Sequence, residues 1–248
     1  MLVKVRIGTS GWMYDHWRGV LYPPELPKKD WLPFYAQIFD TVEVNASFYH
    51  LPKEETFKRW YHETPPNFLF AVKASRYITH VKKLRDVSEA LLLFYRRVEL
   101  LKEKCGPLLF QFPPRLSFFR ETMEAFLREL SPSFRYVFEF RHPSFFCEEL
   151  YELLRTRGIA LCFADTPFFP YAEVTTAPFV YLRLHGSQSL YTHRYSDEEL
   201  LSWAEKIKRW QEKHDVYCYF DNDYRGFAVE NALTLRGALG LSNPSGGL

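Results

Sequence analysis

The sequence predicts a single TIM-like (β/α)8 barrel over residues 1–241. Three observations favour this fold: a length of 248 residues, short apolar runs that alternate with helical patterns, and polar residues within those runs. Barrels of this type typically have about 250 residues, and strands that alternate with helices usually form a parallel sheet. Residues 242–248, with the sequence Ser-Asn-Pro-Ser-Gly-Gly-Leu, are expected to fray as a C-terminal tail.

Eight apolar runs are the predicted strands, and each ends in or carries a charged or hydrogen-bonding residue. In order they are Val5–Ser10, Thr41–Phe48, Phe68–Ser75, Leu108–Phe112, Tyr136–His142, Ala160–Asp165, Val180–Gly186 and Tyr217–Asn222. Strands covered by helices on both faces usually read as continuous apolar sequence. A polar residue in strand after strand therefore suggests one polar site to which the whole chain contributes.

Helical patterns separate the strands. The predicted helices are Trp31–Phe39, Glu54–Glu63, Val87–Lys104, Glu121–Leu130, Glu148–Arg157, Asp197–His214 and Phe227–Leu239. Ser196 and Glu199 form a capping box at the start of residues 197–214. Only the segment after Asp165 lacks a helical pattern, because Pro167 and Pro170 interrupt it, so the sixth βα unit is expected to be irregular.

Side-chain alternation favours a closed barrel over an open sheet. In the predicted seventh strand, Tyr181, Arg183 and His185 share one face and apolar residues share the other. The polar face of the predicted second strand consists of Thr41, Glu43, Asn45 and Ser47. No G-x-G-x-x-G motif follows the first strand, which argues against a dinucleotide-binding open sheet. In a barrel the polar faces point into the lumen, and residues near the C-terminal strand ends line the active-site mouth.

Composition indicates a reduced, cytoplasmic protein. The 32 basic and 30 acidic residues give a net charge of +2, so no global field favours nucleic acid or an anionic membrane. The four cysteines form no C-x-x-C pair, which argues against a disulfide or zinc framework. No apolar run approaches the roughly 20 residues needed to span a bilayer, and the N-terminus lacks the layout of a signal peptide. No membrane partner is therefore predicted.

Ordered motifs along nearly the whole chain resemble the YecE-like family, also called domain of unknown function seventy-two. The motifs include Ile7–Gly19, Thr41–Tyr49, Phe70–Lys73, Thr79–His80, Gly106–Pro114, Glu139–His142, Ala164–Pro167, Tyr181–Gly186 and Tyr219–Asn222. The resemblance implies a TIM-like barrel whose activity is not established. Two positions depart from the pattern: Ser47 stands where the family commonly has Thr, and Asp221 stands where it often has Asn.

The polar residues of the strands suit acid/base chemistry of the hydrolase or lyase type on a small anionic or sugar-like substrate. The predicted inward charges are balanced, with four cations (Arg6, Lys73, Arg141, Arg183) and four anions (Glu43, Glu139, Asp165, Asp221). The predicted catalytic residues are Glu43, Glu139, His185 and Asp165. Predicted substrate contacts are Lys73, Arg141, Arg183, Asn45, Gln111, Trp12, Tyr14, His80, Asp221 and Asn222. Arginine can bind a carboxylate or phosphate with two hydrogen bonds, and no redox cofactor is predicted.

Two other functions compete with this one. A metal-dependent phosphoesterase or nuclease-like barrel would use the carboxylates and His185 to bind a divalent cation, although cations in the lumen oppose such a site. Lys82, Lys83 and Arg85 would then contact nucleic acid. A non-catalytic barrel would bind a ligand without turnover.

Structural interpretations stand beside these functions. The charges also suit an internal ion network without chemistry, above all Arg6, which lies early in its strand. Trp12 and Tyr14 also suit packing under the long first loop, and His80 also suits a solvated basic loop.

Overall fold

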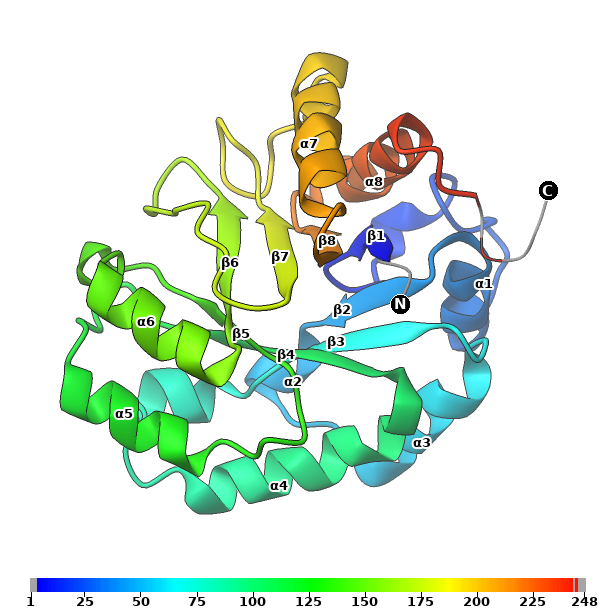
Figure 1. Cartoon of the computed structure of the whole chain (residues 1–248). Coiled ribbons are helices and arrows are strands. Elements are labelled where there is room, and N and C mark those ends of the chain that lie inside the picture. Colours follow the sequence, from blue (N-terminus) through cyan, green and yellow to red (C-terminus); the bar gives the residue numbers. More distant parts are fainter. Residues whose placement is uncertain (1–3, 243, 245–248) are drawn as a thin grey trace.

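A computed structural model describes residues 4–242 and 244 of the chain. Eight parallel strands form one sheet in the order β1-β8-β7-β6-β5-β4-β3-β2, and the helices lie outside it (Figure 1). The strands are β1 (Val5–Thr9), β2 (Thr41–Val44), β3 (Leu69–Lys73), β4 (Cys105–Gln111), β5 (Tyr136–Glu139), β6 (Ala160–Asp165), β7 (Phe179–Leu184) and β8 (Asp215–Phe220). The predicted TIM-like barrel is confirmed. Of the predicted tail, residues 243 and 245–248 lie outside the described residues.

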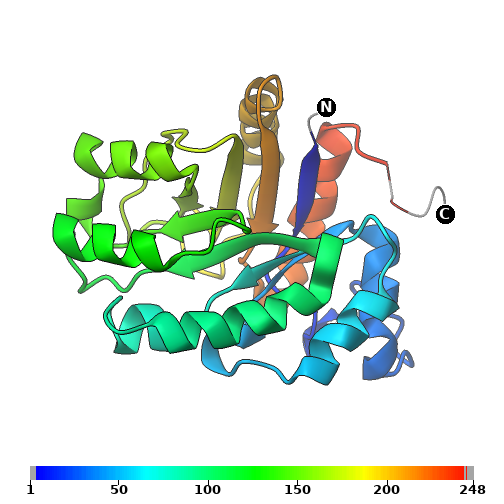
Figure 2. The same cartoon turned by 60° about the horizontal axis from the view of Figure 1, so that its bottom comes forward.

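In the described part of the chain, eight α-helices connect or follow the strands. They are α1 (Trp31–Ile38), α2 (Ala46–Tyr49), α3 (Glu54–Glu63), α4 (Ser88–Val98), α5 (Arg120–Glu129), α6 (Glu148–Arg157), α7 (Asp197–Trp210) and α8 (Phe227–Ala238). Both hydrogen bonds of the predicted capping box are present at Ser196 and Glu199. Residues 166–178 contain neither helix nor strand, as expected for the irregular sixth unit. In Figures 1 and 2, α7 and α8 lie side by side outside β8 and β1. Within the described part of the chain, no helix has the length and apolarity to cross a membrane.

The second strand is shorter than predicted. It ends at Val44, and the next residues turn into the short helix α2, so the expectation that Asn45 and Ser47 continue the strand is wrong. The Ser47 hydroxyl donates to the carbonyl oxygens of Val44 at 3.3 Å and Lys73 at 2.6 Å. A serine that bonds nearby backbone in this way competes with strand pairing, which explains the early turn.

The barrel closes at two short seams. β5 and β6 pair at only two positions, Val137 with Ala160 and Phe138 with Leu161. β1 and β2 meet only through the bridge of Ser10 with Glu43, where the Gly11 N–H donates to the Glu43 carbonyl at 2.8 Å. The barrel is therefore nearly closed and divides into two half-barrels, one of β2–β5 and one of β6–β8 with β1.

A tyrosine hydroxyl fills the gap beside the β1–β2 bridge. The Tyr35 hydroxyl accepts the Thr9 N–H at 3.0 Å and donates to the Thr41 carbonyl at 3.1 Å, replacing a direct strand-to-strand hydrogen bond. At Gly8 a Cβ atom would lie 2.4 Å from the Thr41 carbonyl oxygen, so only glycine allows this close approach of the strands.

The lumen contains two layers. Its lower layer, towards the N-terminal strand ends, is an apolar and aromatic cluster that includes Ala71, Leu109, Val137, Cys162, Phe179, Tyr181, Tyr217 and Tyr219. The upper layer, towards the C-terminal strand ends, consists of Glu43, Gln111, Glu139, Arg183, His185 and Asp221. The predicted alternation in β7 is confirmed, since its Val180, Leu182 and Leu184 belong to the core between strands and helices.

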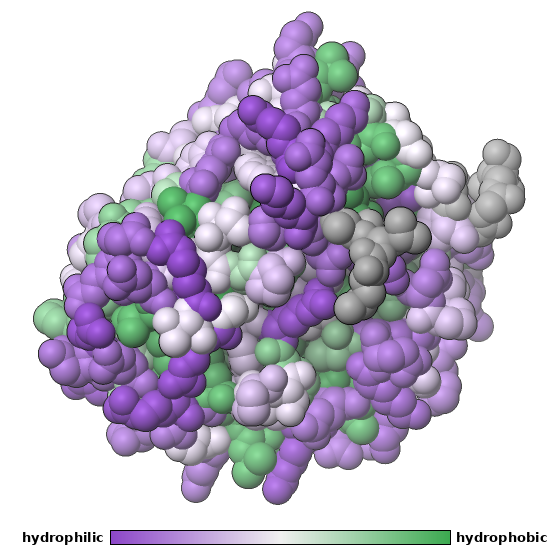
Figure 3. Space-filling model, viewed as in Figure 1, coloured by the Kyte–Doolittle hydropathy of each residue, from purple (hydrophilic) through white to green (hydrophobic). Residues whose placement is uncertain are grey.

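The outer surface near the N-terminal strand ends is mainly polar. On the face drawn in Figure 3, hydrophilic side chains cover most of the molecule, and hydrophobic ones lie between them in small groups. The candidate site lies at the other end of the barrel.

Candidate functional site

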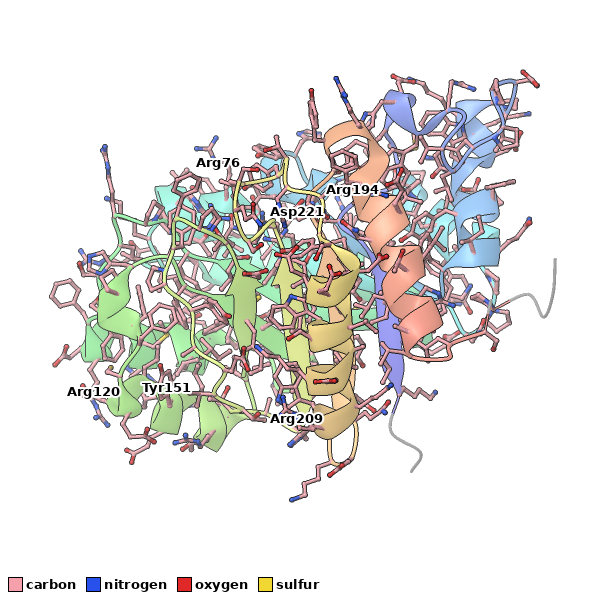
Figure 4. The ribbon with its side chains drawn as sticks, turned by 90° about the horizontal axis from the view of Figure 1, so that it is seen from above. Arg76, Arg120, Tyr151, Arg194, Arg209 and Asp221 are labelled. Carbon is pink, nitrogen blue, oxygen red and sulfur yellow. The ribbon has the colours of Figure 1, made fainter. Side chains whose placement is uncertain are left out.

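The polar residues of the strands meet at the C-terminal end of the barrel. Figure 4 draws Asp221 and Arg76 at this end, while Arg209, near the end of α7, lies at the opposite one. Asp221 follows β8 directly, and Lys73 is the last residue of β3. Because all eight strands are parallel, residues at their C-terminal ends share one rim, as the sequence predicts.

Arg183 is the centre of the upper layer and is completely buried. Its Nε atom donates to both carboxylate oxygens of Glu43, at 3.1 and 3.0 Å. Its NH1 atom donates to Glu139 Oε2 at 2.6 Å, and its NH2 atom donates to Asp221 Oδ2 at 3.1 Å and to Ser10 Oγ at 3.2 Å. One guanidinium thus binds three carboxylates, which is how a buried cation avoids the large cost of being unpaired.

The two glutamates have further partners that fix their orientation. Glu43 accepts a hydrogen bond from the Tyr181 hydroxyl at 2.6 Å and a short one from Ser10. Glu139 accepts from Gln111 Nε2 at 2.8 Å and from Arg141 Nε at 2.9 Å. Both carboxylates are at most 1% exposed, so they lie beneath the surface of the mouth.

The charges around Glu139 and Asp221 keep these two carboxylates ionised. Burial alone would raise the pKa of Glu139, but the cations Arg183 and Arg141 hold this pKa well below its usual range. For Asp221, burial is again outweighed by Arg183 and by His185, and the pKa falls to about 2. Both groups therefore carry negative charge at neutral pH.

His185 lies between two of these carboxylates. Its Nδ1 atom is 2.9 Å from Asp221 Oδ2, but out of line for a hydrogen bond, and its Nε2 atom is 3.8 Å from Glu139 Oε1. The ring is 1% exposed. Among the described residues, the buried Nδ1 atom has no hydrogen-bond partner. The ring therefore lies between Asp221, which lines the mouth, and the buried Glu139.

A cavity of about 490 Å³ opens above the upper layer. It is lined by Tyr14, Asn45, Tyr49, Lys73, Tyr191, Thr192, Asp221, Asp223 and Tyr224. Four of the predicted site residues are in this set: Tyr14, Asn45, Lys73 and Asp221. We call this space the mouth cavity.

Lys73 is the cation that faces the mouth cavity. It is 8% exposed, and its Nζ atom lies 4.2 Å from the centre of the Phe48 ring. Across the described part of the chain, no carboxylate forms an ion pair with it. Burial and the charge of Arg183 lower the pKa of Lys73 to about 8, although Glu139 and Asp221 act in the other direction.

Asp223 is a residue of the mouth cavity that the sequence analysis did not identify. Trp17 Nε1 donates to its Oδ1 atom at 2.6 Å, and His16 Nε2 lies 2.9 Å from Oδ2. Burial and the charge of Asp221 raise the pKa of Asp223 to about 6, against the opposing effects of Trp17 and His16. Its place two residues beyond Asp221, in the loop after β8, is the sequence signal that points to it.

Asp165 and Asn222 lie away from the mouth cavity. Asp165 accepts a hydrogen bond from the Tyr195 hydroxyl at 2.8 Å. The Asn222 side chain donates to the His193 carbonyl at 2.8 Å and to Asn231 Oδ1 at 2.9 Å. These contacts hold the segment between β7 and α7, so both side chains support the wall of the site.

Trp12 and His80 also lie outside the residues that line the mouth cavity. Trp12 packs edge-on against Trp60, with ring centres 5.3 Å apart, and lines a second cavity of about 470 Å³ that shares Tyr14 and Asn45 with the mouth. His80 bonds Thr79 at 2.8 Å. Burial and nearby cations lower the pKa of His80 to about 4, so its ring is neutral at pH 7.

Arg6 lies at the lower end of the barrel, in agreement with its structural interpretation. It donates to the Asp40 carbonyl and to Asp40 Oδ2, both at 2.8 Å. Within the described residues, no group of three or more His, Cys, Asp or Glu side chains is arranged to hold a metal ion. In the upper layer the carboxylates face Arg183 instead of converging on an open position.

Comparison with known proteins identifies the family. A family model described as "Protein of unknown function DUF72" matches residues 6–246. The chain belongs to the DUF72 family. The UPF0759 protein YunF of Bacillus subtilis (strain 168) is 27% identical and matches 92% of this chain and 92% of its own length. The UPF0759 protein YecE of Escherichia coli (strain K12) is 28% identical over 87% of this chain and 85% of its own.

Solved structures of DUF72 proteins share the fold. A DUF72 family protein from Thermotoga maritima MSB8 has a TM-score of 0.87 and 33% identity, covering 96% of this chain and 99% of that one. A DUF72 family protein from Enterococcus faecalis V583 has a TM-score of 0.78 at 21% identity, with 97% and 99% coverage. The resemblance noted in the sequence is confirmed. The family description assigns no activity, so function has to be argued from the site.

Proposed function

We propose that this DUF72 protein is an enzyme that performs acid/base chemistry, of the hydrolase or lyase type, on a small anionic substrate in the mouth cavity. One observation carries the proposal. The same cavity is lined by Lys73, which lacks a carboxylate partner among the described residues, and by Asp221 and Asp223, whose pKa values shift in opposite directions. Titratable groups whose environments separate their pKa values are typical of acid and base pairs.

Each group has a role suited to its chemistry. Lys73 attracts the anionic part of the substrate, and Arg141, which lies near the cavity-lining Tyr191, assists it. Asp223, with a pKa of about 6, supplies a proton near neutral pH. Asp221, which its pKa of about 2 keeps ionised, orients His185 beside it, and His185 accepts one. Glu43 and Glu139, predicted as catalytic, are assigned here to positioning, because Arg183 occupies both beneath the cavity.

The metal-dependent alternative is less well supported. Its basic segment, Lys82, Lys83 and Arg85, lines a different cavity together with Phe119 and Phe145. A nucleic acid on that segment would therefore not lie directly over the mouth carboxylates. Stoichiometric zinc or manganese in protein purified without chelator would nevertheless favour this alternative over ours.

Ligand binding tests the proposal first. We expect phosphate, glucuronate or lactate to raise the melting temperature of the full chain, because a ligand that binds only the folded state stabilises it; at a hundred times its Kd the gain is about 2.7 kcal/mol. The gain should be lost in Lys73→Met and kept in Lys208→Met, an exposed lysine of α7. If no anion stabilises the protein, the proposal is wrong. If a ligand found in this way is never converted, the barrel only binds it.

A further inference from the structure

We propose that Lys73 is a nucleophile that forms an imine with the carbonyl carbon of a small aldehyde or ketone bearing an anionic group. This inference deepens the proposed function and rests on it, because it names the reacting group of the same cavity. It assigns Lys73 a covalent role in place of a purely electrostatic one.

The surroundings of Lys73 differ from those of a structural lysine in the same chain. Lys104 is 4% exposed, and its Nζ atom donates to the Tyr61 carbonyl at 2.6 Å, the Thr64 carbonyl at 2.7 Å and the Thr64 hydroxyl at 3.1 Å. All three donors of that ammonium group are occupied. Lys104 therefore holds the end of α3 and is not free to react.

Lys73 is about as buried as Lys104 but has no such partners. In the part of the chain that the structure describes, its recorded contact is the face of the Phe48 ring, 4.2 Å away, and no carboxylate pairs with it. Its side chain lines the mouth cavity. A buried amine with unused donors, held by an apolar ring and open to a cavity, is positioned to meet a ligand atom.

Burial is the main reason why Lys73 tends towards the neutral amine that the reaction needs. Burial and Arg183 lower its pKa to about 8 against the opposing effects of Glu139, Asp221 and Glu43. About half of the amine is therefore neutral at pH 8, whereas an ordinary lysine with a pKa near 10.4 is almost fully protonated there. Desolvation and a neighbouring cation are the two recognised ways of activating a lysine nucleophile.

The reaction balances without an oxidant or a further co-reactant. The Nζ lone pair attacks the carbonyl carbon, the C–N bond forms, and the carbonyl oxygen becomes the hydroxyl of a carbinolamine. That oxygen takes a proton and leaves as water, and loss of the amine proton gives the neutral imine. Asp223, in the same cavity, is the acid suited to protonate the departing oxygen.

Reductive trapping tests the inference. The full chain is incubated with glyoxylate, pyruvate or glyceraldehyde 3-phosphate and sodium cyanoborohydride, which reduces an imine to a stable secondary amine; labelled residues are then mapped by mass spectrometry. We expect at least one probe to label Lys73 tenfold or more faster than the exposed Lys208, and Lys104 to stay unlabelled. Because the neutral amine of Lys73 (pKa about 8) and protonated Asp223 (pKa about 6) are both needed, the rate at Lys73 should pass through a maximum between about pH 6 and pH 8.

Two lysine variants, and lactate as a ligand without a reactive carbonyl, separate the imine from simple binding. Lys73→Arg should fold, as judged by its melting temperature, and lose the fast label; Lys104→Arg should keep it. If Lys73 reacts no faster than Lys208 with any probe, the imine is ruled out. If lactate still stabilises the wild-type protein in that case, the proposed function stands without the imine. If no probe reacts and neither phosphate, glucuronate nor lactate stabilises the protein, both proposals fail together.

Discussion

The two layers of the lumen lie in the same barrel but are stabilised in different ways. The lower layer is apolar and aromatic, so each side chain there contributes its own buried surface. In the upper layer a single cation, Arg183, serves three carboxylates, so the loss of one side chain affects several others. The comparison teaches that the layers differ in how their parts depend on one another: removing Arg183 leaves several carboxylates without their cation, whereas the lower layer is a cluster of apolar and aromatic contacts.

The largest expected effect is the loss of the shared cation. Arg183→Met should lower the free energy of unfolding by about 3–5 kcal/mol, because Glu43 and Glu139 would remain buried without their partner. Urea denaturation at pH 7 measures this. Arg194→Met, which removes an exposed pair with Glu230, is the control and should cost about 1 kcal/mol or less. Similar losses in the two variants would contradict the network described here.

The lower layer should respond to truncation without regard to pH. Leu109→Ala, at a completely buried position, should lower the free energy of unfolding by about 2–5 kcal/mol through lost burial and a cavity. This substitution leaves every titrating group of the upper layer with its partners. The loss of stability should therefore be equal at pH 7 and pH 4. The loss caused by Arg183→Met should instead shrink at pH 4, where the orphaned carboxylates become protonated. If the loss of stability depended on pH in the same way in both variants, the proposed difference between the layers would be wrong.

The smallest of these effects concerns Asp221 and Asp223. The pKa of Asp221 is lowered to about 2 in the folded protein, so the unfolded protein binds more protons at this side chain. Ionised Asp221 therefore contributes roughly 2 kcal/mol to the free energy of unfolding at pH 7. This contribution is lost as the pH falls from about 5 to 2. Asp221→Asn should therefore flatten the acid side of the stability profile. The pKa of Asp223 is raised to about 6, so Asp223→Asn should do the reverse and stabilise the protein at pH 7 and above. The free energy of unfolding of both variants, measured from pH 2 to 8, would show whether the two substitutions change stability in opposite directions.

Strand periodicity predicted part of the set of residues that enter the lumen. The alternation of Tyr181 and Arg183 with apolar neighbours identified the inward face of β7, and the strand order followed from strand–helix alternation. Depth within the lumen was not predictable in the same way. Glu43 and Lys73 both face inwards, yet Glu43 is completely buried on Arg183, whereas Lys73 lines the cavity. The stagger between strands, which sequence periodicity does not encode, decides this.

Local hydrogen bonds account for the other differences. Ser47 bonds the Lys73 carbonyl and ends the second strand early, a tertiary contact that periodicity does not contain. Asn222 directly follows Asp221, so alternation turns it to the opposite face, where its side chain donates to the His193 carbonyl. Asp223 lies just beyond that motif, in irregular backbone where alternation no longer applies.

The seams of the barrel have a consequence for how the chain folds. Arg183 belongs to the half-barrel of β6–β8 and β1, whereas Glu43 and Glu139, its glutamate partners, belong to the half-barrel of β2–β5. The Arg183 and Glu43 positions are 140 residues apart in the chain. Each half keeps one ion pair of its own, Arg183 with Asp221 and Glu139 with Arg141, but Glu43 would be buried without its cation if its half formed alone. We therefore expect the two half-barrels to fold in one cooperative step, because the ion network is complete only when the barrel is closed.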